Sequence, residues 1–248
     1  MRLDRAILIS WYDLPAAGRE AHLEWLHRTF MPKVLKRPGV LWAAHYAAEK
    51  LTHPPRIRHT SEPIPAGNEY ILLFGAETSH AFTREAKSYA DGTPSRFEAS
   101  LTDEDRKRLA ARVGERVCLM TEEARVDGPD VKLRAGQMTP APCIQLGSFR
   151  GNTIDAEEQL LAWYADWRMP ALGKLPGCVG MRKMVSVHGW AKHGVLYEFA
   201  SLEARNKGMQ EVARLYPEME SWTNRFIPEL THAPGSPNIA CRIWPPVK

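Results

Sequence analysis

The sequence predicts an α+β fold made of two tandem βαββαβ modules. Two observations lead to this prediction. A stretch of residues that contains Trp25 recurs around Trp163, an offset of 138 positions (163 − 25), and the same order of strand-like and helix-like segments surrounds both copies. The chain has 248 residues, of which 44% are hydrophobic and 25% charged, so two small modules with ordinary buried cores are expected.

The repeat aligns residues 20–39 with residues 158–177 without a gap. The identical positions are Glu20/Glu158, Leu23/Leu161, Trp25/Trp163, Met31/Met169, Pro32/Pro170, Lys36/Lys174, Pro38/Pro176 and Gly39/Gly177. Chance alignment of two windows of this length would give about one or two identities at average composition. We therefore interpret the two stretches as equivalent parts of a duplicated module.

Strand and helix signals follow the same order in both halves. In the first half, strands are expected at residues 6–12, 40–46, 70–74 and 116–120, with helices from Glu20 and from Thr78. In the second half, strands are expected at residues 143–149, 178–184, 195–199 and 238–244, with helices from Glu158 and from Ser201. This order is βαββαβ twice.

The first helix of each half has one face that should point to the core, because its residues recur at helical spacing. This face holds Leu23, His27, Phe30 and Val34 in the first half, and Leu161, Ala165, Arg168 and Leu172 in the second. Each helix should end before its Pro-Gly pair. An internal proline, Pro32 or Pro170, removes a backbone donor, so a kink or a short break is expected there.

Residues 1–125 and 140–248 are the expected modules, and residues 126–139 the linker, which begins with turn signals such as Asp127-Gly128-Pro129. A second long connection, residues 50–68, is rich in proline and cations. It is either a lid over a site or a mobile surface loop.

Composition argues against several classes of protein. The net charge of +4 comes from 33 basic and 29 acidic residues without a block of one sign, so no nucleic-acid partner is expected. No apolar run is long enough for a signal peptide or a membrane span, so we expect a cytoplasmic protein. The cysteines Cys118, Cys143, Cys178 and Cys241 are far apart, and buried free thiols are the expected state. No phosphate-binding loop, dinucleotide motif, serine-hydrolase elbow or zinc-protease motif is present.

The repeated segments Trp25…Met31-Pro32…Pro38-Gly39 and Trp163…Met169-Pro170…Pro176-Gly177 resemble the dimeric α/β-barrel (ferredoxin-like) superfamily, most of all its EthD-like and Dabb-like members. The resemblance implies two sheets that face each other as a barrel, with helices outside and a pocket between a sheet and its helices. Members of the superfamily include cofactor-free monooxygenases, polyketide cyclases and isomerases. In single-module members two chains make the barrel, whereas here the two halves can make it within one chain, and a homodimer of this chain is left open. Fold alone does not choose among them.

The chain departs from this family pattern at one position. Many EthD-like proteins carry a histidine near the end of the first helix, where this chain has Phe30 in one half and Arg168 in the other. Any role that depends on that histidine is therefore not expected here.

Four residues are candidates for catalysis. His27, on the core-facing helix surface, and His45, on the second strand, are each a general base or a packed core histidine. Arg168 sits on an apolar face, where a cation needs an ion-pair partner or an anionic ligand such as an enolate. Tyr197 lies on the third strand of the second half, and either it or its neighbour Glu198 should point inward.

Aromatic side chains are expected to line the pocket and to bind a flat, apolar molecule, although core packing explains each of them equally well. The candidates for substrate binding are Trp11, Trp42, Tyr46, Trp163, Trp167 and His188. The spacing of the hairpin histidines His188 and His193 does not suit a metal pair, and no metal site is expected.

Three functions fit these residues. The first is a cofactor-independent lyase, isomerase or cyclase, or a cofactor-free monooxygenase, that acts on a small aromatic or polyketide-like molecule through histidine-mediated proton transfer. The second is a haem-binding protein like chlorite dismutase, with His188 or His193 as ligand. The third is a non-catalytic protein that binds a small molecule.

Overall fold

The computed structural model describes residues 4–50 and 57–247 and contains a closed antiparallel barrel of eight strands. The barrel strands are β1 (Ala6–Asp13), β2 (Val40–Ala48), β3 (Tyr70–Ala76), β4 (Val113–Asp127), β5 (Cys143–Gly151), β6 (Cys178–His188), β7 (His193–Phe199) and β9 (Asn238–Trp244). A ninth, short strand, β8 (Leu230–His232), pairs with the end of β5. Their order is β7-β6-β4-β1-β3-β2-β9-β5-β8, and β5 also pairs with β7, which closes the barrel.

Each half contributes four barrel strands in an equivalent order. The first half gives β4-β1-β3-β2 and the second gives β9-β5-β7-β6, so each sheet has its first and third strands at its centre. The two sheets join at two seams, β4 with β6 and β2 with β9. At each seam the second strand of one module pairs with the fourth strand of the other, as a pseudo-twofold arrangement requires. The predicted fold class, two ferredoxin-like modules that form one barrel, is confirmed.

The first helix of both halves is interrupted at the same place. In the first half it consists of α1 (Arg19–Trp25), a π-helical segment η1 (Leu26–Phe30) and α2 (Met31–Leu35). In the second half it consists of α6 (Ile154–Trp163), a π-helical segment η4 (Tyr164–Arg168) and α7 (Met169–Leu172). Each π-helical segment lies directly before a Met-Pro step, because the proline nitrogen cannot donate the bond that a regular helix needs. The expected break is thus found in both halves.

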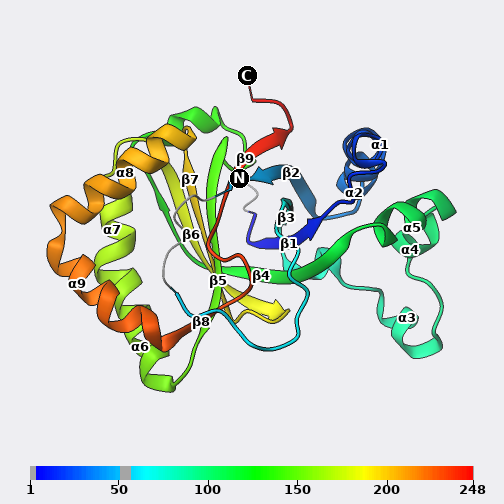
Figure 1. Cartoon of the computed structure of the whole chain (residues 1–248). Helices are drawn as coiled ribbons and strands as arrows, with labels where there is room; N and C mark the ends of the chain where they lie inside the picture. Colours follow the sequence, from blue (N-terminus) through cyan, green and yellow to red (C-terminus); the bar gives the residue numbers. More distant parts are fainter. Residues whose placement is uncertain (1–3, 51–56, 248) are drawn as a thin grey trace.

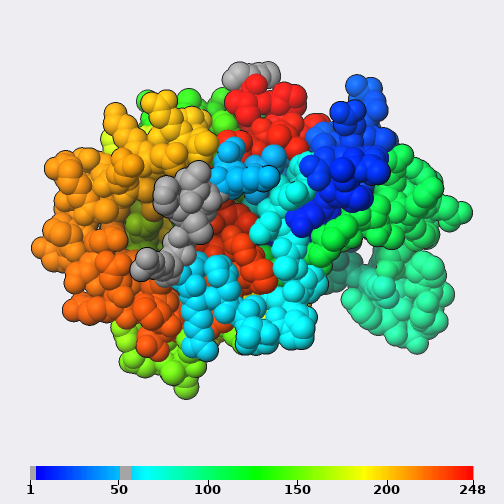
Figure 2. All heavy atoms as spheres, viewed as in Figure 1, coloured from blue at the N-terminus to red at the C-terminus, as the bar shows by residue number. Residues whose placement is uncertain are grey.

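The second helical region differs between the halves. In the first half it is split into short pieces, η2 (Ser79–Phe82), α3 (Ala86–Asp91), α4 (Arg96–Ser100) and α5 (Asp103–Ala110). In the second half it is formed by α8 (Leu202–Leu215) and α9 (Pro217–Phe226), followed by the single turn η5 (Ile227–Glu229). Figure 1 shows α6 to α9 covering the outer face of the second sheet, while α3 to α5 lie away from the barrel. In the space-filling view α8 and α9 form the orange flank and α3 to α5 the teal projection on the opposite side (Figure 2).

The connection between the halves contains η3 (Val131–Arg134). Because β4 continues to Asp127 and β5 begins at Cys143, residues 126–139 fall on the end of β4 and on this connection. The module boundaries at these residues stay a prediction. Among the described residues, Cys118, Cys143 and Cys178 are buried and Cys241 is partly buried, all as free thiols. No helix in the described part of the chain is long and apolar enough to cross a membrane.

Apolar side chains form three layers. The barrel interior is packed with residues of both halves, including Trp11, Trp42 and Tyr46. A second layer lies between the first sheet and α1–α2, and a third between the second sheet and α6–α9. The third layer is not completely filled and encloses a cavity.

A buried ion network links the N-terminal segment of the first half to strands of the second half. The guanidinium of Arg182, which is 0% exposed, lies 2.6 Å from the Asp4 carboxylate and 3.3 Å from that of Glu198. Arg125 also binds Asp4, at 2.8 Å, and Arg134 binds Glu198, at 2.7 Å. Burial acts to raise the pKa of Asp4, but Arg182 and Arg125 outweigh it, so the pKa is lowered and the carboxyl stays ionised.

We expect Arg182→Met to destabilise the fold by about 3–5 kcal/mol, because it leaves buried carboxylates with fewer partners. Chemical denaturation measures the change. Arg214→Met is the matched control, since Arg214 is exposed and its ion pair is with Glu211 on its own helix. The control should unfold like the parent protein, and equal denaturation midpoints for both variants would contradict the assignment.

Candidate functional site

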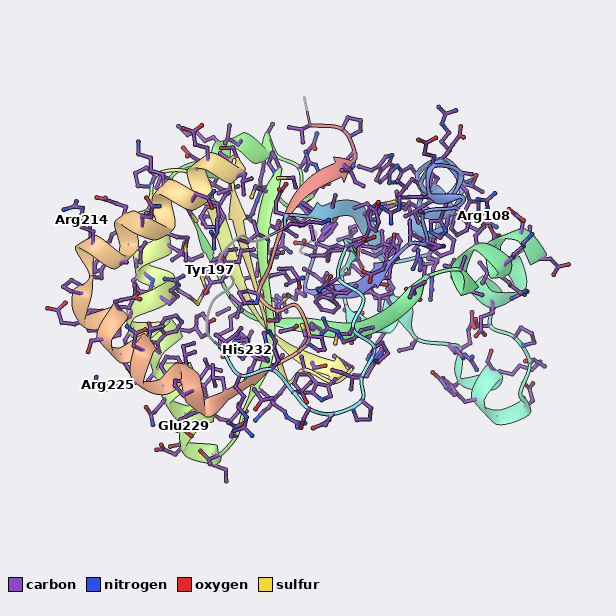
Figure 3. The ribbon with its side chains drawn as sticks, viewed as in Figure 1. Arg108, Tyr197, Arg214, Arg225, Glu229 and His232 are labelled. Atoms are coloured by element: carbon purple, nitrogen blue, oxygen red, sulfur yellow. The ribbon has the colours of Figure 1, made fainter. Side chains whose placement is uncertain are left out.

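A cavity of about 450 Å³ lies between the second sheet and its helices. Strands β5 and β7 form its floor, the helix with η4 forms one wall, and α8, α9, η5 and β8 form the others. Most of the lining is apolar or aromatic, with a few polar side chains, as is usual for small-molecule sites. Figure 3 shows Tyr197 and His232 between the sheet and these helices, whereas Arg214 and Arg225 point outward from them.

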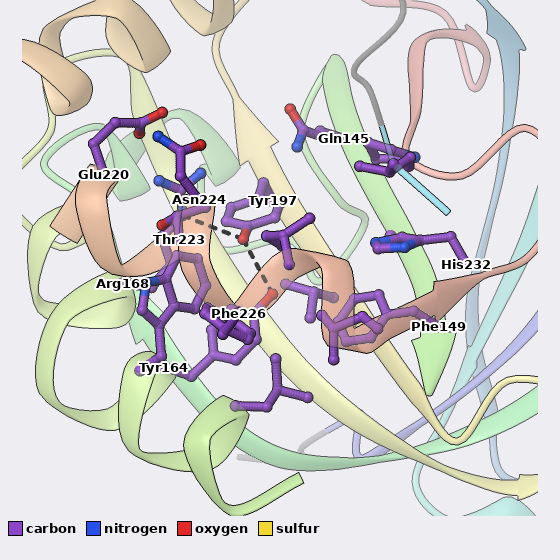
Figure 4. A pocket seen from close by; sticks show the side chains of 18 of the residues that line it. Gln145, Phe149, Tyr164, Arg168, Tyr197, Glu220, Thr223, Asn224, Phe226 and His232 are labelled. Carbon is purple, nitrogen blue, oxygen red and sulfur yellow. Dashed lines mark hydrogen bonds between the residues drawn. The ribbon is translucent and has the colours of Figure 1, made fainter. Parts of the chain in front are cut away.

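Arg168 is a buried cation at the wall of this cavity. Its side chain is 8% exposed, and no carboxylate of the described residues forms an ion pair with it. Its Nε donates a hydrogen bond to the Tyr197 hydroxyl at 3.3 Å, and its guanidinium lies 5.4 Å from the Trp163 ring centre. Glu220 borders the same cavity, on the same side as Arg168 in Figure 4, and no salt bridge joins the two side chains among the described residues. Burial of a guanidinium without an anion is costly, so an anionic group in the cavity would be stabilised strongly.

Two tyrosines extend this hydrogen-bonded group. The hydroxyls of Tyr164 and Tyr197 are 3.4 Å apart, and both side chains are buried. Burial, with a smaller contribution from Tyr197, raises the pKa of Tyr164 well above its ordinary value. Tyr164 therefore remains protonated at any physiological pH and acts as a hydrogen-bond donor. The three groups can together hold an oxygen that carries negative charge.

His232, on β8, is a neutral imidazole on another wall. Its side chain is 5% exposed, and burial lowers the pKa to about 4, with the nearby His59 as a smaller cause. Its ring lies 5.2 Å from that of Phe149, and its Nδ1 has no hydrogen-bond partner among the described residues. Because it is uncharged at neutral pH, it is able to accept a proton from a bound molecule.

A segment of the first half reaches over to this wall. His232 donates its backbone N–H to Arg58 and its carbonyl accepts from Thr60, so the connection before β3 is paired to β8. Ile57 lines the cavity. The predicted lid at residues 50–68 lies partly here, and its residues 51–56 are outside the described chain.

The equivalent place in the first half provides an internal comparison. Leu8 on β1 is paired with Phe74 on β3, and Gln145 on β5 is paired with Tyr197 on β7. Because these are the first and third strands of each module, Leu8 corresponds to Gln145 and Phe74 to Tyr197. Alignment of the helices makes Phe30 the counterpart of Arg168. The cavity at Leu8, Phe30 and Phe74 measures only about 120 Å³. The fold therefore does not require polar residues at these positions, and in this chain the polar residues occur in the half that has the larger cavity.

The predicted bases His27 and His45 lie in the first half, away from the large cavity. His45 is fully buried, with its Nε2 2.8 Å from the Tyr12 hydroxyl and its Nδ1 2.8 Å from Nε2 of His27. Burial lowers the pKa of both histidines. They form a connected polar network inside the first module, and neither lines the cavity described here.

The predicted aromatic residues divide between two layers. Trp11, Trp42 and Tyr46 lie in the packed barrel interior. The guanidinium carbon of Arg116 lies 4.2 Å from the centre of the Trp11 ring. Trp163 lines the cavity, and Trp167 packs beside the same apolar layer without lining it.

The hairpin histidines lie away from the cavity lining. His188 is exposed at the end of β6, and Nε2 of His193 is bound to Glu157. The part of the chain that the structure describes contains no group of three or more His, Cys, Asp or Glu that could hold a metal ion.

Sequence reasoning thus identified Trp163, Arg168 and Tyr197 of this site and missed Gln145, Tyr164 and His232. Gln145 had a signal, since it interrupts the apolar face that Cys143 and Phe149 share on one strand. His232 had none, because its strand is only three residues long.

No family model and no curated protein matches the chain. Solved structures do. A proposed monooxygenase from Fusobacterium nucleatum has a TM-score of 0.59 at 6% identity, covering 98% of this chain and 94% of its own. An anthrone oxidase-like protein has a TM-score of 0.59 at 9% identity, covering 97% and 92%. A proposed chlorite dismutase has a TM-score of 0.52 at 11% identity, covering 97% and 96%.

These likenesses show the dimeric α/β-barrel fold, and at such low identity they show the fold alone. The finer prediction of an EthD-like or Dabb-like protein is not tested by them.

We expect the His232 imidazole to titrate near pH 4 in the folded protein. The unfolded chain takes up this proton near pH 6.5, so the histidine destabilises the fold as pH falls from about 6.5 through 4. Melting temperatures across this range should fall more for the parent protein than for His232→Gln. Melting temperatures that fall equally with pH in both proteins would contradict the prediction. An NMR titration of His232 with a midpoint near pH 6.5 would also contradict it.

Proposed function

We propose that this protein is a cofactor-independent enzyme that deprotonates a small aromatic molecule in the cavity of its second half and stabilises the resulting oxyanion. The observation that carries the proposal is Arg168, a buried cation without a carboxylate partner among the described residues, beside aromatic walls. A flat apolar molecule with a phenolic or enolic oxygen supplies both the apolar contact and the missing negative charge.

The residues divide into three roles. Arg168 and Tyr197 bind the oxygen on which negative charge develops, and Tyr164 adds a further hydroxyl to the same group. His232 accepts the proton as a neutral base. Trp163 and Phe149 pack against the ring system. This replaces the earlier choice of His27 or His45 as base, because the matching space in their half is largely filled.

An enolate or phenolate formed in this way has two outcomes. Reprotonation at another atom gives isomerase, cyclase or lyase chemistry. Reaction of the carbanion form with dioxygen gives a monooxygenase: a CH2 group of the substrate is oxidised to a carbonyl that keeps one oxygen atom, and the other oxygen atom leaves as water with the two hydrogens of that group. The likeness to structures named as a monooxygenase and an anthrone oxidase-like protein supports dioxygen as the next reactant. Oxygen uptake in the presence of hydroxylated aromatic ketones, measured for the parent protein and for Arg168→Met, tests whether dioxygen is the next reactant.

The haem alternative loses the two ligands on which it rested. His188 is exposed outside the cavity, and His193 is engaged by Glu157, so the predicted ligands do not fit a haem in this cavity. The cavity contains His232 as its own imidazole. Titration with hemin therefore accompanies the test. A Soret band that disappears in His232→Ala would replace the present proposal.

We expect Arg168→Met to weaken binding of an aromatic hydroxy acid such as salicylate by at least tenfold, which is about 1.4 kcal/mol, because the charge-assisted contact is lost. Isothermal titration calorimetry measures the change. Tyr197→Phe should have a smaller effect of the same sign. Arg214→Met, which changes an exposed arginine outside the cavity, should bind like the parent protein.

The same Arg168→Met variant should be at least as stable as the parent protein without ligand, because it removes an uncompensated buried charge and places an apolar side chain where the first half has Phe30. Thermal unfolding without ligand measures this. A large loss of stability would mean that Arg168 serves the fold and not a ligand.

A further inference from the structure

The amide of Gln145 is held in one orientation at the edge of the cavity. Gln145 is 8% exposed on β5, directly opposite Tyr197 on β7. Its Oε1 accepts two hydrogen bonds from Arg205, from Nε at 2.9 Å and from Nη2 at 2.6 Å. A guanidinium has only donors, so the amide oxygen must face Arg205 and the amide nitrogen must face away from it.

The amide nitrogen is thereby left as a donor toward the cavity. No hydrogen bond to Nε2 of Gln145 exists among the described residues, and Gln145 lines the cavity while Arg205 does not. Figure 4 shows Gln145 and Arg168 on opposite sides of Tyr197. The cavity therefore offers a cationic group, Arg168, and on the other side of Tyr197 a neutral hydrogen-bond donor, Gln145.

The first half has an apolar pair at the equivalent positions. The turns at Gly39 and Gly177 are equivalent, since their carbonyls accept from Glu77 and Ala200 and each glycine lies against an alanine, Ala81 or Ala204. Phe82 follows Ala81 and Arg205 follows Ala204, so Phe82 occupies the place of Arg205 in the first half. On the strands, Leu8 occupies the place of Gln145. Leu8 and Phe82 line the same small apolar space in the first half. An apolar pair in one half thus corresponds to a hydrogen-bonded pair in the other.

We propose that Arg205 is a positioning residue that fixes the Gln145 amide as a donor, and that the substrate is an aromatic molecule with a carbonyl oxygen at a distance from its ionisable hydroxyl. This inference rests on the proposed function and adds the substrate class. The hydroxyl oxygen binds at Arg168 and Tyr197, and the carbonyl oxygen accepts from Gln145. A buried donor left without an acceptor is unfavourable, so the site discriminates against molecules that lack the carbonyl.

Two probes of nearly equal shape test the inference. 4-Hydroxybenzophenone and 4-benzylphenol differ in that a methylene group replaces the carbonyl group, and titration at about pH 6 keeps both phenols protonated, because the para carbonyl makes the phenol of the ketone the more acidic. We expect the parent protein to bind the ketone at least tenfold more tightly, measured by titration calorimetry. Gln145→Leu should bring the two dissociation constants within about twofold by weakening ketone binding alone. Leu8 in the first half indicates that leucine is compatible with this strand position.

Variants of Arg205 separate positioning from structural support. In Arg205→Met the amide is free to rotate, so the preference for the ketone should fall while the affinity for 4-benzylphenol stays within twofold of the parent value. Arg205→Lys, which keeps a donor toward Oε1, should restore part of the preference. A merely structural role would weaken binding of both probes equally, and that result would overturn the inference.

The outcomes also distinguish the inference from the proposed function. Arg168→Met should raise the dissociation constants of both probes by a similar factor, because both probes carry the hydroxyl group that binds at Arg168. If the parent protein binds both probes equally and through Arg168, the role of Gln145 and Arg205 is wrong and the proposed function stands. If the parent protein binds neither probe, both proposals are wrong.

Discussion

The two seams between the modules, β4 with β6 and β2 with β9, are the constraint on which the rest of the structure depends. Each sheet alone would expose two edge strands and one apolar face, which a module of this size does not tolerate. Pairing second strands with fourth strands removes all four edges at once and buries both inner faces in one core. The buried network of Asp4, Arg182 and Glu198 adds a link between the halves. The outer faces of the sheets are then free to differ, because closure of the barrel does not depend on them.

That freedom explains the asymmetry of the molecule. The outer face of the first sheet is packed by Phe30, Phe74 and Leu8, and its second helical region is short and broken. The outer face of the second sheet is covered by the longer α8 and α9, which leave a cavity where Arg168, Tyr197 and Gln145 replace those apolar residues. Duplication of this kind allows one module to keep a packed layer that stabilises the frame while the other accommodates polar groups that cost stability.

The fold could be predicted from the sequence because its signals are local and occur twice. The Met-Pro step and the Pro-Gly turn fix the same helix interruption and the same turn in each half, so the repeat revealed the topology. The site could be predicted only in part. Periodicity places His27 and Arg168 on a core-facing surface, but it does not reveal whether neighbouring side chains fill the space beyond that surface. This space depends on residues distant in sequence: Phe82 and Phe97 border the small cavity of the first half, and Met209 and Phe226 the large one of the second. His232 belongs to a strand too short to carry a pattern.

Two arginines in this chain show what the cavity is missing. Arg182 and Arg168 are both buried, but Arg182 lies between the carboxylates of Asp4 and Glu198, whereas Arg168 has only hydroxyl, thioether and aromatic contacts among the described residues. Both guanidiniums are removed from water, at 0% and 8% exposure, and among the described residues only Arg182 forms ion pairs with carboxylates. Arg168 lines the cavity, and Arg182 is not among the residues that line it. Under the proposed function the anionic partner of Arg168 is the substrate, which enters and leaves, whereas the partners of Arg182 are residues of the fold.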